Sequence, residues 1–260
     1  MSSLVELRGG RVVELVLNRS DARNALSVDL CNAIVHALET AGASTESRVL
    51  VVRGEGKVFC SGADFGAVSG PGGLDFLPAF ERMLEALARF RLPSVALIHG
   101  AALGGGLQLA TVCDFRIAAA DAKIGIPSTR LGIVVNFENV QRLVLLAGLP
   151  TASEVLMTGR MYTGEEAERR GLVTRSVPAE ELDDAVRSFS ADIAALAPQS
   201  VQGAKRTIAV VADAMANARA TAPDMVREID DLVMQAYNSA DLQEGIRAMT
   251  EKRPPRFEGK

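Results

Sequence analysis

Three consecutive glycines, Gly104-Gly105-Gly106, follow a strand-like apolar run and open a segment with the apolar pattern of a helix. Glycine lets the backbone pass close to another group and adopt conformations that other residues avoid. The start of a helix adds N–H groups without intrahelical partners and a partial positive charge. The triplet therefore indicates either a backbone contact with a ligand or a close helix–strand contact. It fits neither GxGxxG nor GxxxxGK[ST], so no nucleotide motif is present.

Short β-branched runs and helical patterns alternate along the first half of the chain. Strands are expected at residues 12–17, 48–53, 94–98, 114–118 and 123–126, and helices at 27–40 and 76–90. Residues 66–73 are rich in Gly, Ser and Pro, which predicts a mobile loop. Beyond Asn136 the pattern is almost wholly helical, and Thr163 with Glu166 predicts a capping box. This order predicts an α/β fold of β-β-α units with a C-terminal helical region.

Composition and charge limit the classes of function. Of the 260 residues, 48% are hydrophobic and 23% are charged, as in ordinary soluble globular proteins. The formal charge of −4 argues against a general affinity for nucleic acid or anionic membranes. No apolar run is expected to span a membrane and the N-terminal residues lack a signal-peptide pattern, so a cytoplasmic location is expected. The cysteines and histidines are too scattered to predict a disulfide framework or a metal site.

A set of short motifs occurs in one order along nearly the whole chain. The motifs are Asn18-Arg19, Arg23-Asn24-Ala25-Leu26, Phe59-Cys60-Ser61-Gly62-Ala63-Asp64, Gly100-Ala101-Ala102-Leu103-Gly104-Gly105-Gly106, Cys113-Asp114, Leu131-Gly132, Gln141-Arg142-Leu143, Ala167 with Gly171-Leu172-Val173, and Glu251-Lys252-Arg253-Pro254. Together they resemble the crotonase superfamily, the enoyl-CoA hydratases and isomerases. The resemblance implies a crotonase-like spiral of β-β-α units and an activity on acyl-coenzyme A thioesters.

The resemblance also implies an oxyanion hole formed by two backbone N–H groups. One comes from Ala63, which follows Gly62, and the other from Gly105, the middle glycine of the triplet. Physical reasoning agrees, because fixed N–H donors in a dry site stabilise the charge of an enolate oxygen by about 3–4 kcal/mol each. Backbone donors do not depend on side-chain identity, so different reactions can use the same hole.

Further residues are implied to contact coenzyme A, which is part of the substrate, while no permanently bound cofactor and no metal is expected. They are Arg23, Ala25, Ser61, Ala63, Asp64, Phe65 and Gly66, with Lys252 near the phosphates. Arg23 and Lys252 are equally well explained as solvated charges, and Asp64 as a residue that caps the turn. Family members are commonly trimers or dimers of trimers, so a homo-oligomer is implied. Residues 1–195 are then the acyl-CoA-binding core, and residues 196–260 the helical oligomerisation region.

Two positions depart from the hydratase pattern. Hydratases of the family use two glutamates for acid and base catalysis, and the matching positions here hold Gln108 and Ser128. An amide has no proton that titrates near neutral pH, and a lone serine hydroxyl is a poor base. The two-glutamate hydration mechanism therefore cannot operate as such in this chain.

Several interpretations stay open. The chain is either an enzyme of another type, such as an isomerase, decarboxylase or thioester hydrolase, or a binding-only acyl-CoA protein or partner subunit. Glu138 is the first candidate for a displaced acid or base, and its alternative role is a favourable charge at a helix N-terminus. Glu81 and Glu85 are weaker candidates. His99 is interpreted as a core histidine, and a Ser-His-Asp hydrolase lacks the GxSxG motif.

Overall fold

The computed structural model describes residues 3–64, 66, 75–218 and 223–259. The chain forms two compact units, Met1–Ile124 with Tyr162–Ala209 and Gly125–Met161 with Val210–Lys260. Apart from Gly66, the predicted mobile loop at 66–73 lies outside the described residues. The sequence analysis divided the chain at residue 195 into an acyl-CoA-binding core and an oligomerisation region. Because that division is by function, it stays a prediction.

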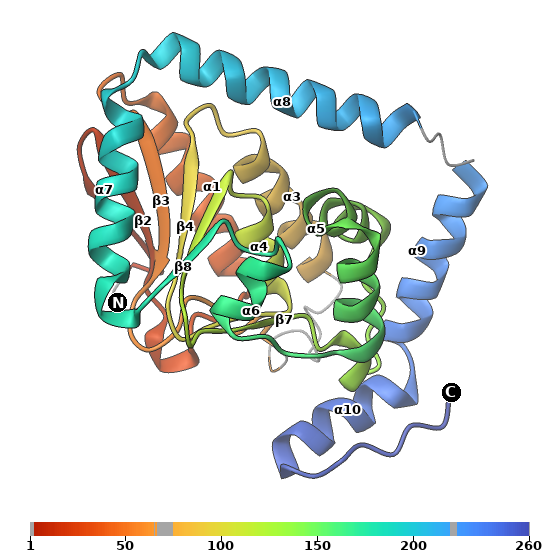
Figure 1. The fold of residues 1–260 in the computed structure, drawn as a ribbon. Helices are drawn as coiled ribbons and strands as arrows, with labels where there is room; N and C mark the ends of the chain where they lie inside the picture. The colour runs from red at the N-terminus through yellow and green to blue at the C-terminus, as the bar shows by residue number, and fades with distance from the viewer. Residues whose placement is uncertain (1–2, 65, 67–74, 219–222, 260) are drawn as a thin grey trace. The chain divides into compact units, whose positions relative to one another are not determined.

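A sheet with the strand order β1-β2-β3-β4-β6-β8 forms the centre of the first unit (Figure 1). Its strands are β1 (Val5–Gly9), β2 (Val12–Leu17), β3 (Val49–Gly54), β4 (Ser94–Ile98), β6 (Phe115–Ala119) and β8 (Arg175–Val177). β1 and β2 are antiparallel, and the other neighbours are parallel. Every residue of β4 is buried, as expected for a strand covered on both faces.

Four of these strands confirm the sequence prediction, whereas β1 and β8 were not predicted. Only Val5 of β1 is buried, so this edge strand has little apolar pattern. β8 is three residues long and gives too short a pattern to read. The β1–β2 hairpin depends on Gly9, which has φ 98° and where a Cβ would lie 2.4 Å from the Val12 carbonyl oxygen.

Helices cover both faces of this sheet. α7 (Leu182–Ala195) packs on one face, and α1 (Val28–Ala43) with α3 (Phe76–Ala88) lies on the other (Figure 1). The Ser27 side chain caps α1 by accepting a hydrogen bond from the Leu30 N–H (3.2 Å). The remaining elements of this unit are η1 (Ser20–Ala22), β5 (Ala101–Leu103), α4 (Gly105–Thr111), α6 (Gly164–Arg169) and η4 (Ala179–Glu181). The predicted capping box of Thr163 and Glu166 is present at α6.

β5 pairs with β7 (Lys123–Gly125) in a small second sheet. α8 (Pro198–Ala218) begins in the first unit and ends in the second. The second unit also contains η3 (Ser128–Arg130), α5 (Phe137–Thr158), α9 (Pro223–Tyr237) and α10 (Ala240–Glu251). α9 contacts both α5 and α10, and η3 contacts α5.

The helix α5 corrects one expectation. Its 22 residues and mean hydropathy of 1.2 have the length and composition of a membrane-crossing helix, so the expectation that no run is long enough was wrong. Length and composition alone are weak grounds, because core helices of soluble proteins pass the same test. The backbone leaves the helical conformation at Gly148 (φ 76°, ψ 163°), just before Pro150. The break leaves two parts that are each shorter than the roughly 20 residues of a span.

Candidate active site

Backbone hydrogen bonds hold the segment that contains the first predicted N–H donor on both sides. On one side the Cys60 N–H donates to the Ala101 carbonyl oxygen (3.1 Å). On the other side the Leu26 N–H donates to the Gly62 oxygen (2.7 Å), and the Asp64 N–H donates to the Leu26 oxygen (2.8 Å). Three stretches that are far apart in sequence therefore lie side by side, and the residue between Gly62 and Asp64 is fixed from both directions.

The glycine triplet and the second glycine segment touch through their backbones. Gly62 has φ 103°, and a Cβ there would lie 2.8 Å from the Leu103 oxygen and 3.5 Å from the Gly105 nitrogen. A Cβ at Gly106 would lie only 2.3 Å from the Cys60 oxygen. The glycines therefore permit a close packing contact, which was one of the two interpretations of the triplet. The same contact places two backbone segments side by side, as the other interpretation, a backbone contact with a ligand, requires.

Two N–H groups at this contact have no acceptor among the residues that the structure describes. Gly105 is the first residue of α4, whose first intrahelical bond runs from the Gln108 N–H to the Gly104 oxygen (3.1 Å). The Ala63 N–H also donates to no atom of the described chain. Ala63 and Gly105 are both partly exposed, so a ligand atom can approach them. Two such donors on adjacent, fixed segments can bind an oxygen atom that carries negative charge.

A buried asparagine anchors the loop that precedes α1. Asn24 is fully buried, and its amide nitrogen donates to the carbonyl oxygens of Glu55 (3.0 Å), Val58 (2.9 Å) and Phe59 (3.2 Å). Its Oδ1 accepts a hydrogen bond from the Arg19 N–H (3.0 Å). The sequence prediction did not choose Asn24 as a site residue, although the Arg-Asn pair in the motif order was a signal for it.

The predicted coenzyme A contacts near this loop differ in their surroundings. Asp64 pairs with Arg19 (2.7 Å) and accepts a hydrogen bond from the Gly66 N–H (3.1 Å), which are the contacts of a residue that fixes the turn. Arg19 also donates to the Ala25 oxygen (2.9 Å). Phe65 lies outside the described residues.

Arg23 and Ser61 connect the loop to the segment before Ala63. The Ser61 N–H donates to the Arg23 oxygen (3.1 Å), and Arg23 adopts a left-handed conformation with φ 53°. The Arg23 side chain is exposed, while Ala25 and Ser61 are partly exposed. The backbone here is fixed, and the guanidinium of Arg23 is accessible to solvent or to a ligand.

Gln108 lies on α4, three residues after Gly105, and its residue surface is 9% exposed. Its side-chain amide is not among the fully buried polar atoms that lack a partner within the described residues. Positions three apart on a helix face the same side. Gln108 therefore lies one turn beyond Gly105 on the same side of α4.

Ser128 and Glu138 belong to the second unit. Ser128 is 7% exposed, and its carbonyl oxygen accepts hydrogen bonds from the N–H groups of Leu131 and Ile133 (both 3.0 Å). Glu138 is exposed in the first turn of α5, where Asn136 is the N-cap. A carboxylate there interacts favourably with the helix N-terminus. The catalytic role of Glu138 stays a prediction.

Comparisons with known proteins show to which family the chain belongs. A family model described as enoyl-CoA hydratase/isomerase matches residues 8–260. The chain belongs to the enoyl-CoA hydratase/isomerase family. A probable enoyl-CoA hydratase from Mycobacterium tuberculosis is 33% identical, with 98% of this chain and 96% of the relative covered. The 2,3-dehydroadipyl-CoA hydratase of Escherichia coli is 31% identical, with both chains fully covered.

Solved structures of the enoyl-CoA hydratase/isomerase family share the fold, which confirms the predicted crotonase-like α/β class. An enoyl-CoA hydratase from Bacillus anthracis superimposes with a TM-score of 0.75 at 30% identity, covering 99% of this chain and 100% of that one. A methylmalonyl-CoA decarboxylase complexed with 2S-carboxypropyl CoA gives a TM-score of 0.89 at 25% identity, with both chains fully covered. The same fold therefore occurs in proteins named for different reactions.

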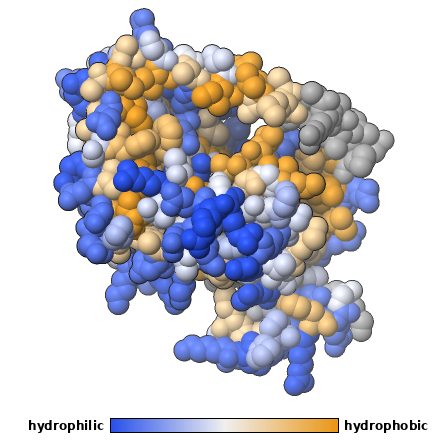
Figure 2. Space-filling model, viewed as in Figure 1, coloured by the Kyte–Doolittle hydropathy of each residue, from blue (hydrophilic) through white to orange (hydrophobic). Residues whose placement is uncertain are grey.

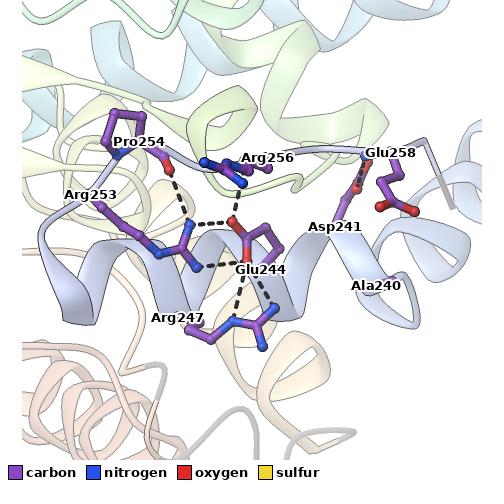
Figure 3. A pocket seen from close by; sticks show the side chains of 8 residues that line it. All are labelled: Ala240, Asp241, Glu244, Arg247, Arg253, Pro254, Arg256 and Glu258. Atoms are coloured by element: carbon purple, nitrogen blue, oxygen red, sulfur yellow. Dashed lines mark hydrogen bonds and ion pairs between the residues drawn. The ribbon is translucent and has the colours of Figure 1, made fainter.

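In this family member, a network around Glu244 fixes the C-terminal segment that follows α10 (Figure 3). Glu244 is 8% exposed and accepts hydrogen bonds from Arg247 (2.9 Å), Arg253 (2.9 Å) and the Arg256 N–H (2.9 Å). The hydrogen bond from Arg253, followed by that from the Arg256 backbone, holds the pKa of Glu244 well below its usual range. Lys252 is exposed at the C-cap of α10, directly before these contacts.

The nucleophilic and basic side chains elsewhere are less suited to catalysis. Burial raises the pKa of Cys31, Cys60 and Cys113 to about 12, so these groups remain thiols. Burial also lowers the pKa of His99, whose Nε2 donates to the Gly56 oxygen (3.1 Å). Its Nδ1 is buried and has no partner within the described chain, so His99 is only half satisfied.

The remaining acid–base candidates lie on α3. Glu85 forms an ion pair with Arg89 on α3, and Glu81 lies partly exposed on the same helix. Within the described ranges, no group of three His, Cys, Asp or Glu side chains is placed to hold a metal ion.

Proposed function

We propose that this protein binds an acyl-CoA thioester and stabilises its enolate between the N–H groups of Ala63 and Gly105. The observation that carries the proposal is the pair of unpaired donors on touching backbone segments, in a member of the enoyl-CoA hydratase/isomerase family. Two donors that are already fixed in place need no reorganisation when charge develops on the thioester oxygen. Each contributes about 3–4 kcal/mol of stabilisation in such sites.

The proposal separates enolate stabilisation from hydration. Gln108 and Ser128 stand at positions that match the hydratase glutamates, and neither side chain is an efficient base. Relatives and structural neighbours include proteins named as hydratases and as a decarboxylase, so family membership leaves the reaction open. We therefore propose an enzyme whose chemistry does not depend on carboxylates at these two positions.

Calorimetry with three ligands tests the enolate proposal. The ligands are an acyl-CoA, its thioether analogue without the carbonyl oxygen, and a nitronate analogue that mimics the enolate. We expect the nitronate to bind at least about 100-fold more tightly than the acyl-CoA, because enzymes bind transition-state-like ligands most strongly. Absence of binding by every ligand at millimolar concentration would refute acyl-CoA recognition.

A second candidate is a binding-only acyl-CoA protein, favoured by the neutral side chains at 108 and 128. Such a protein would bind the acyl-CoA and the nitronate with equal affinity. A hydration assay with crotonyl-CoA tests the proposed loss of hydratase activity. Turnover at rates usual for hydratases would overturn that proposal. The double variant Gln108→Glu, Ser128→Glu is expected to gain hydratase activity if the remaining site is competent.

We also propose that the protein is a homo-oligomer, a trimer or a dimer of trimers, and acts in the cytoplasm. Large apolar side chains are exposed along α8, and Figure 2 shows apolar residues along this helix. They are Ile208, Val210, Val211 and Met215. Light scattering on the purified protein tests this, and a monomer at micromolar concentration would contradict it.

A further inference from the structure

A cavity of about 280 Å³ lies between α7 and the face of the central sheet that this helix covers. α7 contacts β2, β3 and β4 on this face (Figure 1). The lining residues come from β1, β2, β3, β4 and α7, and none of them is a candidate active-site residue. The cavity is therefore a separate feature of the first unit.

Arg53, on β3, lines this cavity and carries a donor without an acceptor. Its Nη1 contacts Asp183 Oδ1 (2.8 Å) and Glu14 Oε1 (3.7 Å). Its Nε is buried and has no hydrogen-bond partner in the part of the chain that the structure describes. Such an N–H is unfavourable, because it has given up its hydrogen bond to water. Since arginine binds carboxylates through two parallel N–H groups, a carboxylate in the cavity would supply the missing acceptor.

The neighbouring strand β2 provides a group of opposite charge. Glu14 also lines the cavity, and its side chain is 34% exposed. Its distance of 3.7 Å from Arg53 is too long for a hydrogen bond, and no other described residue donates to its carboxylate. Glu14 is paired with Val51 in the sheet, and Arg53 follows two residues later, so all three side chains lie on one face. The Glu14 carboxylate is thus an acceptor for an ammonium group beside the Arg53 donor.

The other charges around the cavity are paired within the protein. Arg8 forms an ion pair with Glu6 (2.6 Å), and Arg187 forms one with Asp184 (2.5 Å). One donor and one carboxylate of opposite sign are left for a ligand. A simple anion or a simple cation would satisfy one of these groups and leave the other, whereas a zwitterion satisfies both.

The volume and the apolar part of the wall limit the size of such a zwitterion. The cavity has the volume of about nine water molecules, at roughly 30 Å³ for each. Val51, Leu97 and Val186 line it and are all buried, so a ligand that fills the space also places apolar groups against them. An amino acid with a branched apolar side chain has this size and this distribution of polar and apolar groups.

We propose that the cavity is a binding site for a free α-amino acid with a branched apolar side chain. The carboxylate of the ligand accepts hydrogen bonds from Arg53, and its ammonium group donates to Glu14. Its side chain packs against Leu97 and Val186. The site goes beyond the proposed function, because it shares no residue with the enolate site and leaves the amino acid chemically unchanged.

Leucine is the probe, with isocaproate and isoamylamine as matched ligands that lack the ammonium group and the carboxylate respectively. In calorimetry on the full chain we expect leucine to bind about 10- to 150-fold more tightly than either, the range for losing a hydrogen bond to a charged group. Absence of leucine binding at millimolar concentration would overturn the site. Equal affinity for leucine and one of the matched ligands would overturn recognition of a zwitterion.

Two variants test where leucine binds. Glu14→Gln should lower the affinity for leucine about 10- to 150-fold and leave that for isocaproate unchanged, because only leucine carries the ammonium group. Ala191 is exposed on α7 and lines the cavity, so Ala191→Phe should weaken binding of all three ligands. Glu46→Gln is the matched control, since Glu46 is exposed and lies outside the lining.

Melting curves and acyl-CoA affinity, both expected to match those of the wild type, separate a blocked cavity from a damaged fold. Wild-type affinity for leucine in either folded variant would show that leucine binds elsewhere, and the inference would be wrong. An equal loss for leucine and isocaproate in Glu14→Gln would overturn the assigned role of Glu14.

Discussion

Two regions of the molecule treat their polar groups in opposite ways. Around Glu244 the carboxylate receives hydrogen bonds from two arginines and a backbone N–H, so it is buried and fully paired. Around Ala63 and Gly105 two backbone N–H donors have no acceptor among the described residues. Burial alone therefore does not identify a functional site. A fixed and unpaired donor indicates where a ligand binds, whereas a satisfied network indicates where the chain holds its own structure.

The largest expected effect comes from the glycine contact that holds the unpaired donors in place. In Gly106→Ala the new Cβ would lie 2.3 Å from the Cys60 oxygen, so one of the two backbone segments must move. Because displacing an oxyanion donor has a strong effect, we expect the affinity for the nitronate analogue to fall about 100- to 1,000-fold. Calorimetry measures this change.

Gly10→Ala is the matched control, since a Cβ at Gly10 meets no atom within 4 Å. Both variants should be compared by their melting curves, because a fold change would also weaken binding. Wild-type affinity for the nitronate in a folded Gly106→Ala protein would show that close backbone contact is not needed for the site.

A smaller effect is expected on stability when the anchor of the neighbouring loop is removed. Asn24→Ala leaves the buried carbonyl oxygens of Glu55, Val58 and Phe59 without their shared donor. We expect the free energy of unfolding to fall by about 2–4 kcal/mol. Urea denaturation measures the change, with Asn32→Ala as control because Asn32 is exposed on α1. Equal effects of the two substitutions would contradict the anchoring role.

The sequence predicted the parts of the molecule whose signals are local. The β-branched run of β3, the N-cap Ser27 and the capping box at Thr163 each depend on neighbouring residues, and the structure confirms them. β1 was missed because only Val5 of that strand is buried. The kink of α5 was missed because a glycine within an apolar run is compatible with a continuous helix.

In the candidate site, too, local features could be predicted from the sequence and long-range contacts could not. Glycine residues at 62 and 104–106 were visible in the sequence, but their contact joins segments about forty residues apart, and only the family resemblance paired them. The role of Asn24 depends on where three carbonyl oxygens of another turn lie, which no local pattern encodes.

The stability of the C-terminal segment around Glu244 should depend on pH, because the pKa of Glu244 is lower in the folded chain than in the unfolded one. A carboxylate of this kind stabilises the folded state fully above its unfolded pKa of about 4.3, and the contribution disappears as the pH falls below that value. Glu244→Gln should therefore loosen residues 253–259 at neutral pH and remove most of their acid sensitivity. Hydrogen exchange of those residues between pH 3 and 7 measures both effects, as about 4.3 lies inside that range.

Glu251→Gln is the control for this experiment, since Glu251 also contacts Arg253 but its side chain is 51% exposed. We expect a much weaker response from it, because exposed ion pairs contribute little. If both variants open the C-terminal segment equally, burial of the Glu244 carboxylate is not what fixes the segment beside Lys252.

The smallest effect is expected at Glu138, an exposed carboxylate in the first turn of α5. If the carboxylate serves only the helix N-terminus, Glu138→Gln should leave turnover unchanged within assay error. The loss of a favourable charge at the helix N-terminus should lower stability by about 0.3–1 kcal/mol. Glu165→Gln is the matched control, because Glu165 occupies the first turn of α6 and is also exposed. A strong fall in turnover for Glu138→Gln alone would instead make Glu138 the acid or base of the reaction, and the unpaired region would then need a carboxylate after all.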